Sequence, residues 1–387
     1  MIEHIFMTTD VQPYQINIPE ADIADLKQRI GNTRWTDEVT NAGWNYGTNK
    51  AYLKELSNYW AGDFNWKAQE EKLNSFHHYT VEIDGHSIHF VYEKGLGTTS
   101  TPVVLLHGWP GTFMQMNHII PLLLQPDEQG HSFDVIVPSL VGYGFSKPAT
   151  EKGMAFYKMA GLFHKLMTEK LGYPQFLLRG TDLGTVIARE WSMTFPEHVL
   201  ALHLSGSNPF IYLIPKDLSA AEKSFVQKCQ AFMMAEGAYI AEQSTKPQTL
   251  AYALNDSPVG LAAWIIEKFK SWSDNTGHPE SRFSRDELLT NISIYWFTQT
   301  IGPSFRLYCE GARTFSPNMT KKVPVPVAFF MLQKDIAIAP REWEDRTYAS
   351  ITRWNVHPSG GHFAEWEEPE AVANDMREFV KELKQGI

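Results

Sequence analysis

Residues 176–193 read FLLRGTDLGTVIAREWSM, and this stretch decides how the rest of the chain is interpreted. It begins with an apolar strand pattern at 176–178 and ends with helical spacing at 186–193. Between them lies Gly180-Thr181-Asp182-Leu183-Gly184, with a glycine two residues before and two residues after the central aspartate. Glycines at these positions allow a sharp, strained turn. The pattern predicts an aspartate at the tip of a strand–turn–helix unit or, more simply, an aspartate that caps the helix.

Short apolar runs recur on both sides of this turn, at residues 103–106, 135–137, 176–178, 200–204 and 325–332, and residues 352–356 are the candidate for a last strand. Helical stretches separate them, and a last helix is expected at 370–384. Runs without polar alternation are typical of strands buried on both faces, which predicts a mostly parallel sheet covered by helices. Residues 79–83 and 88–92 alternate around Asp84-Gly85 and predict a hairpin.

Residues 207–320 interrupt this order with predicted helices at 220–237, 260–271 and 285–300, after which the sheet resumes. An insertion between two strands of one sheet is expected to lie above it as a helical cap. The first 75 residues are expected to form a helical meander, with no strand of good quality before Tyr79. The expected division is an N-terminal region at 1–75, a core at 76–206 and 321–387, and a cap at 207–320.

The composition and net charge indicate which partners and cofactors are not expected. The 387 residues have a net charge of -10, and this balance repels phosphates and anionic lipid, so neither nucleic acid nor a membrane surface is an expected partner. The chain has no run of ~18 apolar residues and no pattern of a secretory signal, so a cytoplasmic protein without a membrane anchor is expected. Cys229 and Cys309 lack the spacing of a metal site, and neither metal nor cofactor is expected.

A strand, a sharp turn with a central nucleophile and a helix are typical of the nucleophile elbow of α/β-hydrolases. In many of these enzymes the nucleophile is a serine that attacks a carbonyl carbon. A carboxylate attacking a carbonyl would give an unstable anhydride, whereas its attack on a saturated carbon gives a stable alkyl ester that water must cleave. Asp182 therefore indicates an epoxide or an alkyl halide as the substrate.

The loop His107-Gly108-Trp109-Pro110-Gly111 follows the strand at 103–106, where α/β-hydrolases place an oxyanion donor. The backbone N–H groups of Trp109 and Leu183 are the expected oxyanion hole. His107 is expected to hold the loop rather than to act as a base.

His362, in Ser359-Gly360-Gly361-His362-Phe363, is the expected base, because hydrolases place nucleophile, acid and base in this order along the chain. Asp335 is the first carboxylate after the strand at 325–332 and is expected to orient His362. The competing loop after residues 200–204 offers no carboxylate, only Ser205, Ser207 and Asn208.

With these motifs the chain resembles, over nearly its whole length, the epoxide hydrolases that carry an extra N-terminal region, the microsomal and fungal type. The matching stretches are TRW at 33–35, DFNW at 63–66, TKPQTL at 245–250, DSPVGL at 256–261, YW at 295–296, RLYCE at 306–310, PREW at 340–343 and GGHF at 360–363. Without the anchor of the microsomal members, it resembles the soluble branch. It departs at the elbow, where many relatives have a second glycine and then an aromatic residue.

The resemblance implies that Tyr308 and Tyr239 hang from the cap and hold and protonate the epoxide oxygen, with Tyr252 as the alternative to Tyr239. Together with Trp109 they would bind a small apolar epoxide, which reacts with water to a vicinal diol, with detoxification as the expected role. A homodimer is left open.

Two other functions compete with this interpretation. A haloalkane dehalogenase uses the same triad but commonly has a tryptophan after the nucleophile, where this chain has Leu183. A non-catalytic ligand receptor on a hydrolase fold usually loses part of the triad, whereas Asp182, Asp335 and His362 are all present here.

Overall fold

The apolar runs form one sheet in the computed structural model, which describes residues 8–206, 214–314, 316–318 and 321–386. Within these residues the sheet has nine strands in the order β1-β2-β3-β5-β4-β6-β7-β8-β9. The strands are β1 (Gln12–Tyr14), β2 (His78–Ile83), β3 (His86–Glu93), β4 (Thr99–Leu106), β5 (His131–Pro138), β6 (Phe176–Thr181), β7 (Val199–Ser205), β8 (Val323–Leu332) and β9 (Tyr348–His357). The pairs from β5 to β9 are parallel, which confirms the predicted sheet.

The antiparallel edge contains the predicted hairpin of β2 and β3. Ile83 pairs with His86, and the two turn residues between them, Asp84 and Gly85, have φ of 50° and 79°. Positive φ at both positions is the geometry that an Asp-Gly turn favours. The prediction of no strand before Tyr79 is wrong, because β1 pairs with β2 at the edge of the sheet. This strand is only three residues long, too short for a period of two to be visible.

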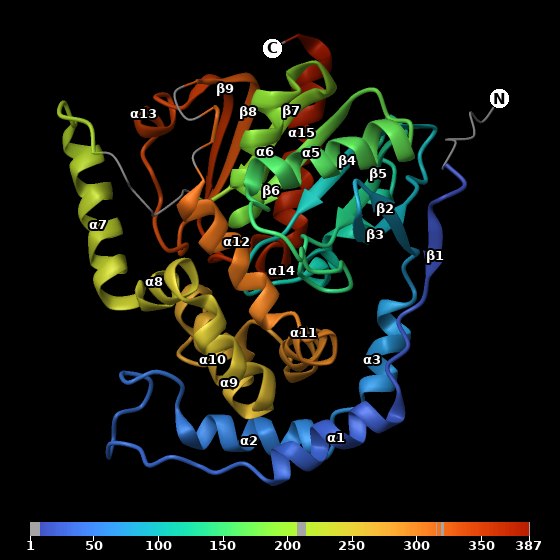
Figure 1. The fold of residues 1–387 in the computed structure, drawn as a ribbon. Helices are drawn as coiled ribbons and strands as arrows, with labels where there is room; N and C mark the ends of the chain where they lie inside the picture. The colour runs from blue at the N-terminus through green and yellow to red at the C-terminus, as the bar shows by residue number, and fades with distance from the viewer. Residues whose placement is uncertain (1–7, 207–213, 315, 319–320, 387) are drawn as a thin grey trace.

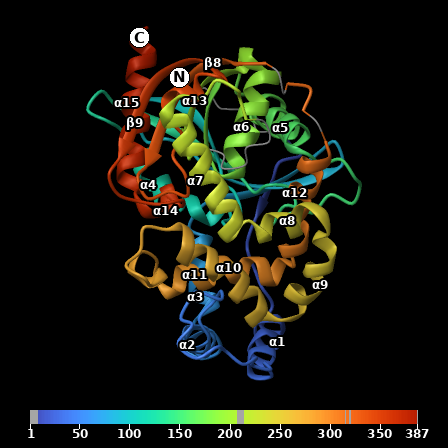
Figure 2. The ribbon, with the colours of Figure 1, turned by 90° about the vertical axis from the view of Figure 1, so that its left-hand side faces the viewer.

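Helices cover both faces of the sheet, as the buried strands require; every residue of β5 is buried. The core helices are α4 (Ile119–Leu124), α5 (Phe156–Lys165), α6 (Leu183–Thr194), α13 (Arg341–Glu344), α14 (Ala364–Glu367) and α15 (Pro369–Gln385), with short helices η1 (Phe113–Met116), η2 (Leu166–Lys170) and η3 (Pro196–His198). In Figure 2, α5 and α6 lie on one side of the sheet, and α4 and α15 lie on the other.

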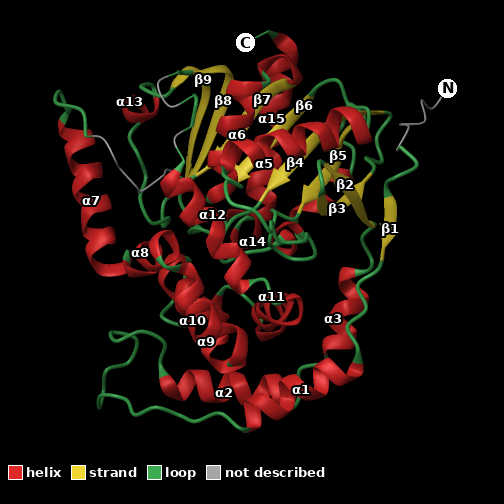
Figure 3. Ribbon diagram, viewed as in Figure 1, coloured by secondary structure: helices red, strands yellow, loops and turns green. Residues whose placement is uncertain are grey.

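Between β7 and β8 the chain leaves the sheet, and the regular secondary structure of its described residues there is all helical (Figure 3). These are α7 (Ala220–Glu236), α8 (Ala238–Thr245), α9 (Pro247–Asp256), α10 (Pro258–Trp272), η4 (Pro279–Ser281), α11 (Arg285–Thr298) and α12 (Ile301–Arg313). The expected cap limits, 207 and 320, lie outside the described residues. The three predicted cap helices are present, but α8, α9 and α12 were not predicted. Single residues, Gly237, Lys246 and Ser257, join α7 through α10, so no loop separates these helices.

The N-terminal helices α1 (Glu20–Gly31), α2 (Lys50–Ala61) and α3 (Trp66–Leu73) lie against the cap on the side away from the sheet (Figure 1). The Trp60 indole N–H donates to Ser293 Oγ of α11 at 3.0 Å, and the Tyr59 hydroxyl donates to Asp286 at 2.8 Å. Two layers, the sheet and the N-terminal helices, thus hold the cap between them. In the described part of the chain no helix is long and apolar enough to cross a membrane.

Candidate active site

The elbow has the geometry that its glycines indicate. Asp182 stands between the end of β6 and the start of α6 with φ 49° and ψ −126°, in the left-handed region that a non-glycine residue rarely adopts. A Cβ at Gly184 would lie 2.1 Å from the Leu106 carbonyl oxygen, and one at Gly180 would lie 2.7 Å from the Gly184 oxygen. The strained turn therefore requires both glycines, and it projects Asp182 away from the sheet.

The carboxylate of Asp182 does not cap the helix, because its side chain makes no capping hydrogen bond to α6. Instead Oδ1 accepts a hydrogen bond from the Trp109 N–H at 2.8 Å. The loop approaches so closely that a Cβ at Gly108 would lie 2.0 Å from the same oxygen. The N–H of Leu183, the second predicted oxyanion donor, is the first amide of α6 and has no acceptor among the described residues.

Residues of α11 fix the loop that carries Trp109. Asn291 Nδ2 donates to the Pro110 carbonyl at 2.8 Å, and the Tyr295 hydroxyl donates to the Gly111 carbonyl at 2.8 Å. His107 is fully buried, its Nε2 accepts from the Leu140 N–H at 3.3 Å, and burial lowers its pKa to about 4. This placement agrees with a structural role for His107.

The structure brings together the three residues that the sequence placed far apart. His362 Nδ1 lies 3.0 Å from Asp335 Oδ1, and His362 Nε2 lies 3.3 Å from Asp182 Oδ2. The first contact is a hydrogen bond, whereas the second lacks hydrogen-bond alignment. The proton on Nδ1 therefore faces Asp335, and Nε2 faces the nucleophile.

At the competing acid position, the structure describes Ser205 alone of the three candidate residues. The Ser205 hydroxyl donates to the Phe330 carbonyl at 2.7 Å and accepts from Arg179 at 2.7 Å, so it is already bound. Ser207 and Asn208 lie outside the described residues. Among the described residues, Asp335 is the carboxylate that contacts Nδ1 of His362.

The charge of His362 depends on its two carboxylate neighbours. Burial by itself would lower the pKa of the imidazole, but Asp182 and Asp335 outweigh it and raise the pKa to about 10. At neutral pH the imidazole is therefore a cation between two anions. A cation cannot act as a base, so His362 must lose its proton before it can activate water.

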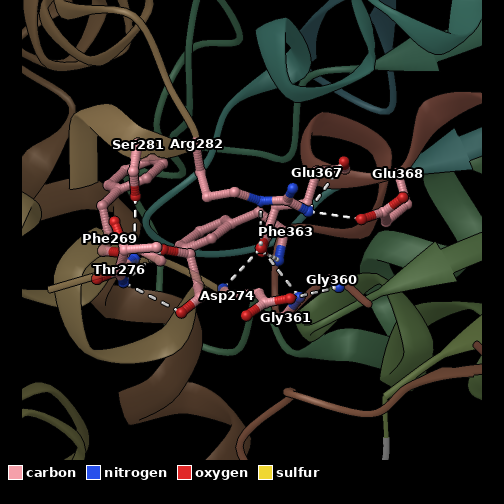
Figure 4. A network of polar contacts seen from close by, with 12 residues as sticks. Phe269, Asp274, Thr276, Ser281, Arg282, Gly360, Gly361, Phe363, Glu367 and Glu368 are labelled. Carbon is pink, nitrogen blue, oxygen red and sulfur yellow. Dashed lines mark hydrogen bonds and ion pairs between the residues drawn. The ribbon is translucent and has the colours of Figure 1, made fainter. Parts of the chain in front are cut away.

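A buried carboxylate holds the loop that carries His362 (Figure 4). Glu367 accepts from the Gly361 N–H at 2.9 Å and from the Phe363 N–H at 3.0 Å, one on each side of the base. It also accepts from the Asp274 N–H at 2.7 Å, and Arg282 Nε lies 3.4 Å from its Oε2. Because Asp274 and Arg282 belong to the cap segment, this one carboxylate joins the cap to the base loop.

Two further contacts strengthen this junction. The His362 N–H donates to the Trp272 carbonyl at 2.8 Å, and the Gly360 N–H donates to the Asp274 side chain at 3.1 Å. Four consecutive amides of the loop, from Gly360 to Phe363, are therefore bound, two of them to the cap and two to the carboxylate that also binds the cap. The position of the base thus depends on the cap.

Four buried tyrosines lie near enough to Asp182 for its charge to act on them. The hydroxyls of Tyr143 and Tyr295 donate to the carbonyls of Ser304 and Gly111, at 3.0 and 2.8 Å. Those of Tyr239 on α8 and Tyr308 on α12 have no hydrogen-bond partner among the described residues. Two phenols are thus free to donate to a ligand.

These two tyrosines form an aromatic wall with residues of the core and cap. Tyr239 stacks on Trp109 with ring centres 5.2 Å apart, and Tyr308 meets the same indole edge-on at 6.2 Å. Trp272 lies between Tyr239 and His362, at 5.1 and 5.3 Å. Tyr239 is 3% exposed, whereas Tyr252 is 71% exposed and does not face the site.

The sequence analysis missed Glu367, Asn291 and Trp272. Glu367 belongs to the acidic run EWEEPE, which has the composition of a solvated surface, and Asn291 lies in a helix without a distinctive motif. Trp272 ends α10, one residue beyond the predicted helix. Among the described residues, no cluster of His, Cys, Asp and Glu could hold a metal ion.

Two family models match the chain, one described as epoxide hydrolase N terminus at residues 11–116 and one as alpha/beta hydrolase fold at residues 101–369. The chain is 37% identical to epoxide hydrolase 1 of Oryctolagus cuniculus over 403 residues, which cover 96% of this chain and 88% of the relative. Its fold is similar to that of juvenile hormone epoxide hydrolase from Bombyx mori, with a TM-score of 0.86, 30% identity and coverage of 98% and 95%. Aspergillus niger epoxide hydrolase gives a TM-score of 0.85 at 28% identity, with coverage of 98% and 99%.

Proposed function

This chain belongs to the epoxide hydrolases of the α/β-hydrolase fold, and on that premise we propose that it adds water to a small apolar epoxide through a covalent ester on Asp182. One observation carries the proposal: a carboxylate at the tip of the elbow lies close to two buried phenols that have no partner among the described residues. The carboxylate supplies a nucleophile for carbon, and the phenols supply donors for oxygen.

In the first step, Asp182 attacks an epoxide carbon while Tyr239 and Tyr308 donate to the ring oxygen. An alkoxide leaves poorly unless it is protonated or strongly hydrogen-bonded. Burial, and then the charge of Asp182, raise the pKa of both tyrosines well above the ordinary value, so both carry their protons at working pH. Two donors also hold the epoxide at a fixed angle to the nucleophile.

In the second step, water attacks the carbonyl carbon of the Asp182 ester. Esterification removes the charge of Asp182, so His362 keeps only Asp335 as an anionic partner and becomes easier to deprotonate. The neutral imidazole then takes a proton from water. The N–H groups of Trp109 and Leu183 stabilise the oxyanion of the tetrahedral intermediate, and its collapse releases the diol.

A dehalogenase is the rival that shares this triad. The buried indole N–H groups of Trp109 and Trp272 have no partner among the described residues and are the donors that a halide would use. A halide leaves without a proton, however, and gives the two free phenols no role. The receptor alternative is less well supported, because Asp182, His362 and Asp335 are already assembled at 3.0–3.3 Å.

The proposal is tested with a panel of epoxides, followed by diol formation, and a panel of haloalkanes, followed by halide release. Diol formation that is lost in Asp182→Asn and kept in Tyr252→Phe is the expected result. Tyr252 is a matched control because it is an exposed tyrosine of the same cap. Halide release without diol formation, or full diol formation by Asp182→Asn, would refute the proposal.

A further inference from the structure

A lysine is buried beside one of the two free tyrosines. Lys268 of α10 is 5% exposed, and its ammonium lies 5.0 Å from the centre of the Tyr239 ring. The rings of Trp272 and Trp264 lie 5.6 and 6.0 Å from the same ammonium. Burial of an ammonium is unfavourable unless other groups replace its water. The faces of the three aromatic rings replace part of the water of the Lys268 ammonium. They also hold this cation over the ring of an active-site phenol, Tyr239.

Two carboxylates complete the surroundings of the lysine. Glu236 of α7 lies 3.6 Å from Lys268 Nζ, and Glu267 contacts it directly. After burial and Asp182, the charges of these carboxylates also raise the pKa of Tyr239, so they disfavour any negative charge on its ring. The positive charge of Lys268 has the opposite effect to that of its two carboxylate partners, because it favours negative charge on the Tyr239 ring.

A cation over an aromatic face is attracted to the ring electrons, and the attraction grows when the ring gains negative charge. Tyr239 gains such charge while its proton moves to the epoxide oxygen. The contact is therefore stronger in the transition state of ring opening than before it, which is the condition for an effect on rate. Among the described residues, no lysine or arginine lies over the ring of Tyr308.

We propose that Lys268 is a positioning residue that makes Tyr239, and not Tyr308, the tyrosine that gives its proton to the epoxide oxygen. This inference rests on the proposed function, because it assigns different tasks to the two donors named there. Tyr308 then holds the oxygen by a hydrogen bond and keeps its proton.

The step balances with the residues present. An oxygen of Asp182 forms a bond to the epoxide carbon, the carbon–oxygen bond breaks, and its electron pair stays on the oxygen. That oxygen takes the proton of Tyr239, which leaves a phenolate beside the ammonium of Lys268. The phenolate is restored by the one proton that the imidazolium of His362 must lose, and the neutral imidazole is left as the base for the second step.

The test measures the two half-reactions of single turnovers separately, by rapid quench and the mass of the Asp182 peptide. Lys268→Met is expected to slow ester formation about 3- to 30-fold, the range of a desolvated cation–π contact, and to leave ester hydrolysis unchanged. Lys268→Arg keeps the charge and should retain most of the rate. Glu267→Gln removes a partner of the lysine but also a charge that opposes the phenolate, so its ester formation should not slow.

Combined variants separate this role from packing. With Tyr239→Phe in place, Lys268→Met should cause no further loss, because there is no phenol proton left to influence. With Tyr308→Phe in place, the same change should cause its full loss. If Lys268→Met does not fold, Lys268→Gln replaces it in both backgrounds, because the glutamine amide can still bind both carboxylates.

Three results would overturn the inference. The first is that Lys268→Met slows ester formation as much in the Tyr239→Phe background as in the wild-type enzyme. The second is that Glu267→Gln slows ester formation as much as Lys268→Met does. The third is that Tyr239→Phe forms the ester at the wild-type rate. Failure of the proposed function is read separately, because the wild-type enzyme would then form no ester on Asp182.

Discussion

Formation of the Asp182 ester is predicted to change the protonation of His362, and the size of the change follows from the geometry. In the free enzyme the pKa of His362 is raised to about 10, with Asp182 Oδ2 at 3.3 Å and Asp335 Oδ1 at 3.0 Å. A unit charge at 3.3 Å in surroundings with an effective dielectric constant of about 20 contributes about 5 kcal/mol. At about 1.4 kcal/mol for each pH unit, loss of that charge brings the pKa of His362 to about 6 or 7 in the alkyl-enzyme.

The direction of the pH effect follows from the role of the base. Ester hydrolysis needs neutral His362, so its rate should rise with pH through about 6 or 7 and then level off. Ester formation should show no inflection in this range, because His362 of the free enzyme keeps its proton up to a pH of about 10.

Single-turnover rates of both steps, measured from pH 5 to 9, test this directly. Asp335→Asn is the informative variant, since loss of the remaining anion should move the inflection of hydrolysis to lower pH. A hydrolysis rate that still rises in proportion to hydroxide at pH 9, or one that is independent of pH across the whole range, would refute the reasoning.

Three further changes have defined outcomes. His362→Gln should trap the alkyl-enzyme as a mass increase equal to the substrate, with turnover reduced about 10²–10⁴-fold, and an inactive variant that never gains mass would give His362 another role. Tyr239→Phe and Tyr308→Phe should each slow ester formation, measured before the steady state, and the double variant should abolish it; ester formation at the wild-type rate in the double variant would make both tyrosines packing residues. Ser293→Ala leaves the buried indole N–H of Trp60 unpaired and should lower the free energy of unfolding by about 1–3 kcal/mol in urea titrations, so an unchanged midpoint would contradict the described contact.

Local pattern was enough to predict most of the sheet. Continuous apolar runs identified the five strands from β4 to β8, because a strand buried on both faces has no polar alternation. β9 is only partly buried and carries polar residues, so it has no such run. Asp84-Gly85 identified the hairpin of β2 and β3, because this dipeptide favours the two-residue turn with positive φ that joins hairpin strands. β1 has too few residues to form a pattern, and α8, α9 and α12 follow other helices with almost no intervening loop.

Some residues of the site could likewise be predicted from local pattern, and others could not. Asp182, Asp335 and His362 follow from their positions at the ends of strands, since the carboxyl ends of parallel strands meet at one edge of a sheet. Tyr239 and Tyr308 could be named only through a family resemblance, because a buried tyrosine with a free hydroxyl looks like any other in sequence.

The buried charged residues behind the site could not be predicted from the sequence. Glu367 lies in an acidic stretch whose composition is that of a surface, and Lys268 lies in a largely apolar helix where a charge is unexpected, yet both side chains are buried. Their burial depends on contacts between the cap and the base loop, or between cap helices. Those contacts join residues that are distant along the chain, so no local window contains them.

The central claim is that Asp182 becomes covalently attached to the substrate, and the most direct test is a single turnover in water enriched in heavy oxygen. With enzyme in excess over an accepted epoxide, the account predicts that the first diol carries almost no label, because its new oxygen comes from Asp182. The label should appear instead in the peptide that contains Asp182. A fully labelled first diol together with an unlabelled Asp182 peptide would mean that water attacks the epoxide directly, and the covalent mechanism would be wrong.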